Sequence, residues 1–436
     1  MKIAVIGNSA AALSAIEAFR KHDRTSDIVV VSREKHPAYS RVLLPYFLQG
    51  RIGRDQLFFP AGRFAGGAKV RTFLGRSVEE VDLFRKRLFL DSGEKIPFDK
   101  LLIASGSSPV KLRIPGWDDR HIHHLWTIDD AVRIGRLLKG KKELLLIGGG
   151  AISLMVAWIA VQKKMKVTVV ERLPRLMPQV LDAKGAEIVE AAIRKAGVRV
   201  LTRTTIERIE RRPEGRFRVH PACGRSFRAD VIIVAVGVRP NVGFIDGGRV
   251  SVDQGILVDD RMQTSFPDVY AAGDVAQGPT AYGARPRVDA LWSTAVEHGA
   301  VAGANIAGKE THYPGCLGGN VCEFFGLTIG SVGALEESSS AVGAERSDSH
   351  GRSYAKLFSR GGIPVGGLIL GSAEDAAWLG ALRSCILSKK SPPDPGAPRI
   401  AGPARAARRL GPNSAFANFL APPRMAKPGA EFKGTP

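Results

Sequence analysis

The sequence predicts an α/β fold with two strand–turn–helix units, and three observations support this. Each unit opens with a short unbroken apolar run, as in a strand buried on both faces of a parallel sheet. A glycine follows directly after each run, at Gly7 and at Gly148. An acidic residue follows the next apolar run, at Glu34 and at Glu171. Strand, glycine turn, helix, strand and acid is the layout that seats a dinucleotide.

The central unit, residues 143–171, carries the clearest signal. Leu144–Ile147 and Val167–Val170 read as strands, separated by three glycines at 148–150 and an apolar stretch of helix length. The glycines let the backbone approach a pyrophosphate, and the helix start offers free N–H groups and a partial positive charge. Glu171 lies close to the roughly 20 positions after the first glycine expected of a carboxylate that binds ribose.

A membrane-spanning helix is the alternative interpretation of this stretch. Residues 144–161 carry no charged side chain, and about 18 apolar residues are enough to suggest a span. Each glycine would cost a helix roughly 1 kcal/mol, and a span gives no role to the strand that follows. We therefore expect no membrane span.

The N-terminal unit repeats the pattern with small residues in place of two glycines. Ile3–Ile6 reads as a strand, Gly7 follows it, and Ser9 and Ala12 stand where the other two glycines would be. Ile28–Val31 reads as the second strand, and Glu34 comes three residues after it, so Glu34 is a candidate ribose ligand. A solvated loop carboxylate is the alternative.

Three further features accompany these units. Arg41 is a single basic residue in a proline-bracketed apolar segment and is either solvent-facing or paired with a pyrophosphate or flavin edge. The turn at 104–106 and the one at Gly237 follow buried strands, where small residues permit close approach of a ligand. Residues 273–274 deliver Asp274 after another strand, either to accept hydrogen bonds from sugar hydroxyls or to cap a helix.

Length and composition limit the class of protein. A chain of 436 residues is long enough for two or three domains. The net charge of +21 permits nucleic acid, a membrane surface or acidic partners, but the arginines are scattered and only 7% of residues are aromatic. We therefore expect acidic partners and no nucleic acid. Four cysteines and a strand directly after Met1-Lys2 predict a cytoplasmic protein without a secretory signal.

The histidines and cysteines show no metal-site pattern. His121, His123 and His124 have a spacing unlike that of zinc ligands, and no Cys-x-x-Cys is present. We expect no metal.

The order of these motifs resembles that of the two-dinucleotide-binding-domain flavoproteins, the pyridine nucleotide–disulfide oxidoreductase superfamily. Within it, the sequence is most similar to the FAD module of the nitrite reductase large subunit and to NADH:rubredoxin or ferredoxin reductases. The resemblance runs from residue 1 to about 385. It rests on GNSAAALSA from Gly7, PAYSRVLLPYFL from Pro37, IASGSSP from Ile103, LLIGGGAISL from Leu145, VIIVAVGVRPN from Val231, VYAAGDVA from Val269, and LWSTAVEHG with NIAGK after it.

The resemblance implies two nested Rossmann-like domains of the FAD/NAD(P)-binding fold. Residues 1–112 and 240–333 would bind FAD, and residues 113–239 would bind NAD(P)H. A small α+β domain would follow at 334–387, and 388–436 would be a disordered basic tail rich in Pro, Ala and Arg.

The resemblance also assigns cofactor residues. Glu171 would accept from ribose hydroxyls and repel a 2′-phosphate, which favours NADH over NADPH, although Arg172 and Arg175 could reverse this. No catalytic side chain is required, because the cofactors carry the chemistry. FAD would contact Gly7, Ser9, Ala10, Ala12, Glu34, Arg41, Ala104, Gly106, Gly273 and Asp274, and the nicotinamide nucleotide would contact Gly148, Gly150, Ile152, Glu171 and Gly237.

Departures from the family pattern narrow the activity. Disulfide-reducing relatives place a redox cysteine within the segment 41–45, which has none here. Many ferredoxin reductases pair a lysine with a glutamate beside the flavin, where this chain has Tyr46 and Met155. Ser153 replaces a glycine or alanine of the central turn.

These observations predict an FAD-dependent NAD(P)H oxidoreductase that passes electrons from NADH to a separate carrier or subunit. A rubredoxin, a ferredoxin or an iron–sulfur subunit with an acidic surface would suit the basic chain. The alternatives are a nucleotide-binding redox sensor or accessory subunit with little turnover, and an NADH oxidase. A homodimer is a further option.

Overall fold

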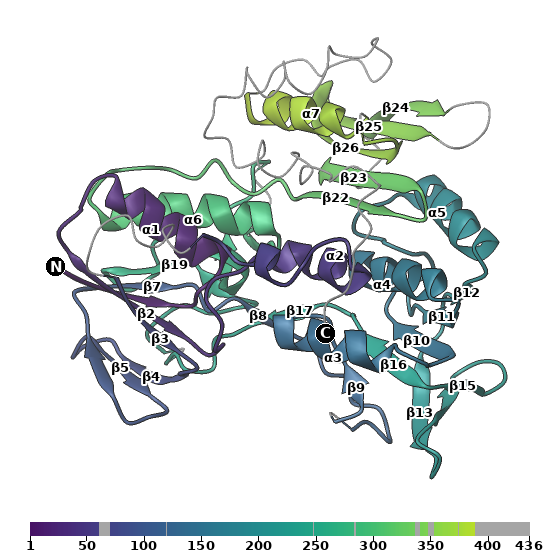
Figure 1. The fold of residues 1–436 in the computed structure, drawn as a ribbon. Coiled ribbons are helices and arrows are strands. Elements are labelled where there is room, and N and C mark those ends of the chain that lie inside the picture. The colour runs from purple at the N-terminus through teal and green to yellow at the C-terminus, as the bar shows by residue number, and fades with distance from the viewer. Residues whose placement is uncertain are drawn as a thin grey trace, which may run out of the picture. The chain divides into compact units, whose positions relative to one another are not determined.

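The computed structural model describes residues 1–60, 70–118, 120–246, 248–282, 285–335, 341–347, 353–373 and 375–388. All of these belong to one compact unit, residues 1–396. Three five-stranded sheets organise this unit, and we refer to them as the N-terminal, central and C-terminal sheets (Figure 1).

The N-terminal sheet is parallel throughout, in the order β19-β7-β1-β2-β3. Both faces pack into one apolar core. Helices α1 and α6 lie side by side on one face, and the antiparallel strands β4-β5-β6 lie on the other (Figure 1). The bounds are β1 Lys2–Ile6, α1 Ala10–Arg20, β2 Asp27–Ser32, β3 Val70–Leu74, β4 Val78–Asp82, β5 Arg87–Leu90, β6 Lys95–Pro97, β7 Lys100–Ile103, β19 Val269–Ala271 and α6 Trp292–Ile306.

The central sheet repeats this plan in the order β12-β11-β10-β16-β9, again parallel throughout. Leu144 and Leu146 of β10 face a core shared with α3, α4 and α5, whereas Leu145 and Ile147 face a core shared with β13-β14-β15. This period of two is expected of a strand buried on both faces. The bounds are β9 Ile122–His123, α3 Ile128–Leu137, β10 Glu143–Ile147, α4 Ala151–Gln162, β11 Lys166–Val170, α5 Ala183–Lys195, β12 Arg199–Leu201, β13 Ile206–Arg211, β14 Phe217–Pro221, β15 Phe227–Ala229 and β16 Val231–Val234.

Two extended segments connect the N-terminal and central sheets. β8, Ser107–Pro109, leaves the N-terminal sheet after β7, and β17, Val238–Pro240, returns after β16. The two segments pair antiparallel. The central unit is therefore inserted into the N-terminal one, which confirms the predicted nested arrangement of two Rossmann-like units. The other short elements described are α2 Leu44–Gln49, β18 Ile256–Leu257, β20 Ala276–Gly278, β21 Arg287–Val288 and the 3-10 helices η1 Arg41–Leu43, η2 Asp55–Leu57 and η4 Gly273–Val275.

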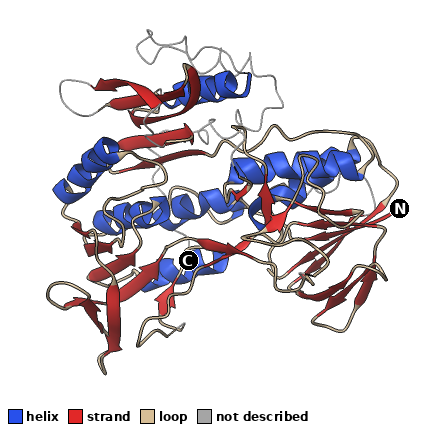
Figure 2. Cartoon of the chain, turned by 180° about the vertical axis from the view of Figure 1, so that it is seen from behind, coloured by secondary structure: helices blue, strands red, loops and turns tan. Residues whose placement is uncertain are grey.

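The C-terminal sheet is antiparallel, in the order β22-β23-β26-β25-β24, with α7 beside it (Figure 2). One face joins the core of α4 and α5, and the other packs against α7. Because β23 pairs with β26, this sheet extends across the boundary predicted at residue 334. The bounds are β22 Gly319–Phe324, β23 Leu327–Gly333, β24 Ala341–Ser347, β25 Tyr354–Arg360, β26 Ile363–Gly371 and α7 Ala376–Ser388.

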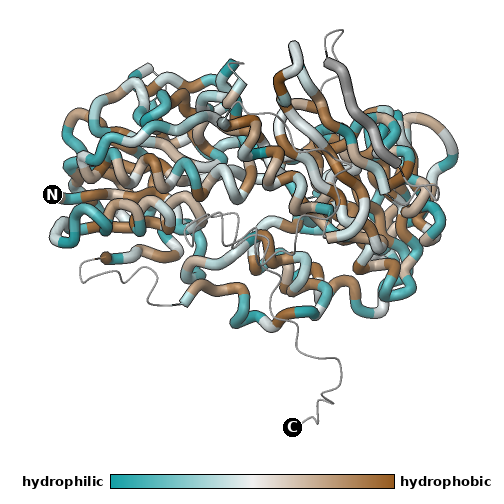
Figure 3. The backbone as a smooth tube through the Cα atoms, turned by 90° about the horizontal axis from the view of Figure 1, so that it is seen from above, coloured by the Kyte–Doolittle hydropathy of each residue, from teal (hydrophilic) through white to brown (hydrophobic). Residues whose placement is uncertain are grey.

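Hydrophobic stretches are short and interrupted by hydrophilic ones along the tube (Figure 3). Among the described helices, none combines the length and the apolar character needed to span a bilayer. The predicted disordered tail lies outside the described residues, apart from Ser388 at the end of α7.

Candidate functional site: two dinucleotide seats

Both glycine turns follow the middle strand of a parallel sheet. β1 lies between β2 and β7, and β10 lies between β11 and β16, so the strand order reverses at each of these strands. Ligands of open α/β sheets bind at the carboxyl ends of the strands at such a switch point. The fold therefore places the predicted residues at the carboxyl edges of the two sheets.

Gly7 connects β1 to α1 with a backbone that only glycine adopts readily. Its φ is +117°, and a Cβ there would lie 2.0 Å from the carbonyl oxygen of Ala104. Ser9 is the N-cap of α1, and its side chain makes no capping hydrogen bond. The first-turn N–H groups, including those of Ala10 and Ala12, therefore have no side-chain cap from Ser9 and can bind an anion.

The central turn has the same geometry. Gly148 has a φ of +104°, and a Cβ there would lie 2.3 Å from the carbonyl oxygen of Ala235. Gly150 is the N-cap of α4, and no atom of the chain lies within 4 Å of a Cβ built on it. Ile152, in the first turn of α4, is 38% exposed despite its apolar side chain. A pyrophosphate can approach this turn without meeting a side chain.

Glu171 closes the central turn from the end of β11. Its Oε2 accepts a hydrogen bond from the Gly149 N–H at 2.6 Å, and its Oε1 accepts one from the Leu173 N–H at 2.7 Å. Both oxygens keep a further lone pair for a sugar hydroxyl. Gly237 follows β16, which lies on the other side of β10 from β11. It has a φ of +111° and open space around its Cβ position.

Glu34 and Arg41, which the sequence suggests separately, form one cluster. The Arg41 guanidinium donates to Glu34 Oε1, and the Tyr39 hydroxyl donates to Glu34 Oε2 at 2.5 Å. Arg41 also donates to the Trp126 carbonyl at 2.5 Å, and its guanidinium lies 5.4 Å from the ring centroids of both Tyr39 and Trp126. Arg41 is therefore not simply solvent-facing: its charge is fixed beside the candidate ribose ligand.

Asp274 lies after β19, and Ser107 of β8 donates to its Oδ2 at 2.6 Å. Burial raises the pKa of the Asp274 carboxyl, while the Ser107 hydrogen bond and the charge of Arg41 act to lower it. Gly273 has a φ of +78° and lies close to α1 and α6. The carboxylate thus reaches the same edge of the N-terminal sheet as the turn at Gly7.

The turn at Gly106 is held by the returning segment. Gly106 has a φ of +65°, and its carbonyl accepts the Asn241 N–H at 2.9 Å. The Asn241 side chain donates to the Ser105 carbonyl at 2.9 Å and accepts from the Ser108 hydroxyl at 2.7 Å. These bonds join the two connecting segments next to both seats.

The residues present fit two dinucleotides. Each seat combines a left-handed glycine, a helix start without a side-chain cap and a carboxylate after the next strand. Two buried acceptors near the turns, Asn8 Oδ1 and Ser153 Oγ, have no partner within the described chain. Buried polar atoms of this kind are normally satisfied, and a ligand or water would do so.

Sequence reasoning missed several residues that complete the site. Tyr39, Ser107, Trp126 and Asn241 hold the predicted residues, but none of them was a candidate. Tyr39, Ser107 and Asn241 lie inside the family motifs quoted above, and Trp126 lies outside them. The signal for Tyr39 is its place two residues before Arg41. The others are distant in sequence from the groups that they contact, and only the fold brings them together.

The cysteines offer no redox pair. All four are free, and Cys316 and Cys322 are buried. Burial raises the pKa of Cys316 and raises that of Cys322 to about 12, so neither thiol is ionised near neutral pH. In the described part of the chain, no group of three potential metal ligands comes together.

The family is decided by a match over most of the chain. Residues 1–299 match the family described as pyridine nucleotide-disulphide oxidoreductase. This chain belongs to that family. It is therefore an NAD(P)H oxidoreductase, as predicted, and the predicted cofactors, FAD and NADH, are those that the family uses.

Individual members support this assignment. The chain is 32% identical over 369 residues to the epsilon subunit of NADH-dependent phenylglyoxylate dehydrogenase from Aromatoleum evansii, covering 84% of this chain and 87% of that one. It is 29% identical to the NADH-rubredoxin oxidoreductase of Clostridium acetobutylicum, over 77% of this chain and 82% of that one. An NAD-dependent persulfide reductase from A. fulgidus superposes with a TM-score of 0.81 and 25% identity, covering 96% of this chain and 83% of that one.

Proposed function

We propose that this chain accepts electrons from NADH and passes them, through bound FAD, to a separate electron carrier or partner subunit. One observation supports the separate acceptor. Two dinucleotide seats lie in one nested unit, while the segment 41–45 beside the FAD seat contains no cysteine that could receive electrons within the chain. Among relatives, one is named as a rubredoxin reductase and another as a subunit of a larger dehydrogenase.

The protein would bind and orient the two cofactors, and the cofactors themselves would carry out the reaction. When bound, the nicotinamide supplies a hydride, and the flavin accepts it and can release electrons one at a time. We assign FAD to residues 1–112 and 240–333, and NADH to residues 113–239. The N–H groups at the start of α1 and α4 would hold the pyrophosphates, and the nearby glycines leave room for them.

The charged residues would position the sugars. Glu34, held by Arg41 and Tyr39, would accept from the FAD ribose, and Asp274 would accept from the hydroxyls next to the flavin ring. Glu171 would accept from the NADH ribose, and its charge disfavours a 2′-phosphate. A charge-assisted hydrogen bond of this kind contributes about 1.5–3 kcal/mol.

The cellular compartment is inferred from the cysteine content of the chain. Four free cysteines suit a reducing compartment, so we place the protein in the cytoplasm. A small acidic redox protein is the partner that its charge favours. A homodimer stays a prediction.

Anaerobic mixing of the flavin-loaded protein with NADH tests this function. Rapid bleaching of the flavin absorbance, followed by reoxidation on adding rubredoxin or ferredoxin, is the expected result. FAD binding without reduction by NADH would instead support a redox sensor. Fast reoxidation by air with no response to the carriers would support an NADH oxidase.

A further inference from the structure

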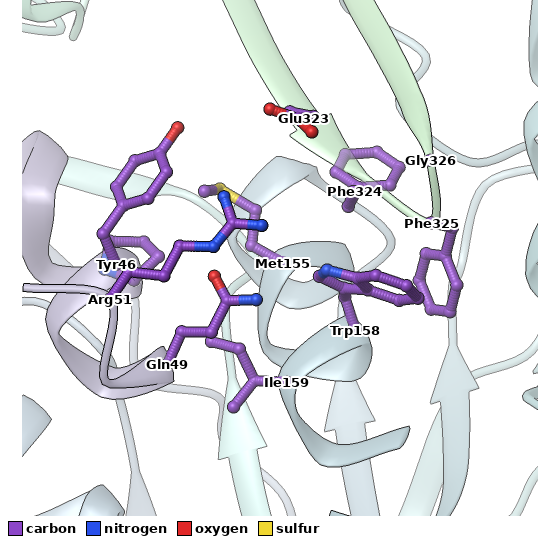
Figure 4. A pocket seen from close by; sticks show the side chains of 11 residues that line it. Tyr46, Gln49, Arg51, Met155, Trp158, Ile159, Glu323, Phe324, Phe325 and Gly326 are labelled. Atoms are coloured by element: carbon purple, nitrogen blue, oxygen red, sulfur yellow. The ribbon is translucent and has the colours of Figure 1, made fainter. Parts of the chain in front are cut away.

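A cavity between α2, α4 and the turn that joins β22 to β23 belongs to the cofactor site (Figure 4). Tyr46 and Met155 line it, and these positions lie beside the flavin in the ferredoxin reductases that the sequence resembles. A surface that neither dinucleotide seat uses lies on the three-stranded sheet β13-β14-β15. This sheet packs on the side of the central sheet that faces away from α4 (Figure 1).

The β13-β14-β15 sheet has one buried face and one exposed face. Its inner side chains are buried in the core shared with the central sheet, namely Ile209, Phe217, Val219 and Ala229. Side chains alternate between the two faces of a strand, so the neighbours Arg208, Arg218 and Arg228 lie on the outer face. All three arginines are exposed. We refer to this outer surface as the arginine face.

The sequence of this sheet is rich in arginine. Residues 206–229 contain seven arginines, three glutamates and no lysine, a net +4. These 24 residues therefore carry more than a quarter of the net +14 on residues 1–388. Protein interfaces are enriched in arginine and depleted of lysine. The composition thus fits a binding surface better than a face that is only hydrated.

Arg218 and Arg228 lie directly opposite each other in the antiparallel pairing of β14 with β15. The Cβ atoms of such a pair are about 4.5–5.5 Å apart, and two like charges at this distance destabilise a sheet. Arg218 donates to the Ser226 hydroxyl at 3.3 Å, and no carboxylate of the described residues pairs with either guanidinium. Glu210, opposite Arg218 on β13, forms ion pairs of 2.9 Å with two other arginines. The chain therefore holds two neighbouring positive charges without a counter-charge of its own.

We propose that the arginine face docks a helix of a partner protein that carries two glutamates or aspartates four positions apart. Residues i and i+4 of a helix have Cβ atoms about 5–6 Å apart, close to the spacing of opposite residues in a sheet. Each carboxylate would accept two N–H bonds from one guanidinium, and the two pairs would relieve the repulsion within each protein. The proposal rests on the proposed function for the existence of a partner subunit, and it gives that subunit a place outside both dinucleotide seats.

A protein fits the arginine face better than a nucleic acid does. Glutamates at 207, 210 and 214 lie among the arginines and would repel a phosphate backbone. The outer positions of β13, β14 and β15 carry no Phe, Tyr or Trp on which bases could stack, since Phe217 and Phe227 pack toward the core. A surface of mixed sign instead complements a protein surface that is mostly acidic.

Fluorescence anisotropy with two labelled peptides tests the docking surface. The first peptide has about 15 residues, carries glutamates at i and i+4, and is stapled because a helix of this length is marginal in water. Its isomer carries the glutamates at i and i+2, which do not share a side of the helix. In 0.15 M NaCl, the full-length, flavin-loaded protein should bind the first peptide more tightly than its isomer. The double substitution Arg218→Gln/Arg228→Gln should weaken the first peptide about tenfold or more and abolish the preference.

Arg133→Gln/Arg136→Gln is the matched control, because these two arginines are exposed neighbours on α3 and the substitution removes the same charge. It should leave both affinities within about twofold of the wild type. The proposal is overturned if the two peptides bind equally or if the two double variants have equal effects. Tighter binding of a DNA duplex of about 15 base pairs than of the first peptide would also overturn it. Flavin content and bleaching by NADH, measured on the same samples, report the proposed function separately.

Discussion

Gly7 and Gly150 both open a helix toward a candidate dinucleotide, but the chain needs them for different physical reasons. Gly7 is held in a left-handed backbone against the carbonyl of Ala104, so a side chain there collides with the protein itself. Gly150 has an ordinary φ of −82°, and a Cβ there meets no atom of the chain. The first glycine is a requirement of the fold, and the second leaves room for a ligand.

Replacing Gly150 should therefore separate binding from stability. We expect Gly150→Ala to keep the free energy of unfolding within about 0.5 kcal/mol of the wild type, because nothing is displaced. We expect the dissociation constant for NADH to rise about tenfold or more, since the methyl group enters the space of the pyrophosphate. Urea unfolding and titration with NADH under anaerobic conditions measure the two quantities.

Gly7→Ala serves as the contrast. The backbone collision and the left-handed φ should together lower the free energy of unfolding by about 2–4 kcal/mol, and the flavin content should fall with it. Gly93→Ala controls for the φ alone, because Gly93 has a φ of +83° and open space around it. Equal losses in stability for Gly7→Ala and Gly150→Ala would contradict this distinction.

His298 makes stability depend on pH. It lies in α6, is 1% exposed, and neither ring nitrogen has a partner within the described chain. Burial lowers the pKa of His298 from its ordinary 6.5 to about 4. The unfolded chain therefore binds a proton between these values while the folded chain does not, so stability falls as the pH drops from about 6.5 to about 4.

Replacing this histidine should flatten the pH profile. In the wild type, the titration of His298 should lower the free energy of unfolding by about 3 kcal/mol between pH 6.5 and 4, since each pKa unit corresponds to about 1.36 kcal/mol. We expect His298→Leu to abolish this decrease. Urea unfolding at several pH values measures it. His312→Leu is the control, because His312 is exposed beside Asp260. A profile for His298→Leu that parallels the wild type would show that another group titrates.

At the scale of elements, the strands that carry a strong apolar run were predictable. The predicted strands Ile3–Ile6, Leu144–Ile147 and Val167–Val170 match β1, β10 and β11, each of which begins one residue earlier than predicted. Short strands such as β8 and β17 were not predictable. Three polar or proline-containing residues have no period of their own, and they become strands only because the fold places them side by side.

Contacts between distant segments leave no local pattern in the sequence, and this also limits how much of the site can be predicted. Glu34, Arg41 and Asp274 were suggested by local motifs, because turns and strand ends leave a local signature. The Arg41–Glu34 ion pair and the Ser107 bond to Asp274 were not, because they depend on how distant segments meet. Local chemistry is readable from sequence, whereas the partners of each group follow from packing.

The contact between α1 and α6 depends on two glycines of α6. A Cβ on Gly299 would lie 2.2 Å from the Ala11 carbonyl oxygen, and one on Gly303 would lie 2.1 Å from that of Ala15. Ser14 also donates to the Val296 carbonyl at 2.7 Å. The two helices are therefore in backbone contact, and this contact joins the start of the chain to residues near 300.

Gly303→Ala should push the two helices apart. We expect a loss of about 1–3 kcal/mol in the free energy of unfolding, from overpacking against a backbone that cannot rotate away. Gly135→Ala in α3 is the matched control, because its Cβ would meet only Leu48 at an ordinary 3.5 Å. There, the higher helix propensity of alanine should raise stability by up to about 1 kcal/mol. Thermal and urea unfolding measure the change in stability of both variants. A change of the same sign in Gly303→Ala and Gly135→Ala would contradict the prediction.

Across residues 1–396, side chains tie the C-terminal sheet to both dinucleotide units. The Tyr354 hydroxyl donates to Asp182, the N-cap of α5, at 2.7 Å, and the Arg383 guanidinium of α7 donates to Glu297 of α6 at 2.5 Å. One contact reaches the central unit and the other the N-terminal unit. The C-terminal sheet is thus positioned to hold the two units in a fixed relation, which hydride transfer between two bound cofactors requires.

The charge of the whole chain determines how it meets a partner. Residues 389–436 contain nine Lys/Arg and two Asp/Glu, a net +7, which leaves +14 of the total +21 on residues 1–388. Most of the charge therefore belongs to the part of the chain that contains the proposed cofactor seats. A positively charged protein and a negatively charged partner attract each other, which raises their association rate at low ionic strength.

The rate of reoxidation by an acidic carrier should accordingly fall with salt. We expect the second-order rate constant with ferredoxin to decrease about tenfold or more between roughly 0.01 and 0.5 M NaCl, because the Debye length shrinks from about 30 Å to a few ångströms. Stopped-flow mixing of the NADH-reduced protein with the carrier measures it. Menadione, an uncharged acceptor, should show little change. A chain ending at Ser388 should keep most of the salt dependence, since it retains two thirds of the net charge. A rate constant that is unaffected by salt would rule out electrostatic docking and leave the excess of arginine and lysine without a role in choosing the acceptor.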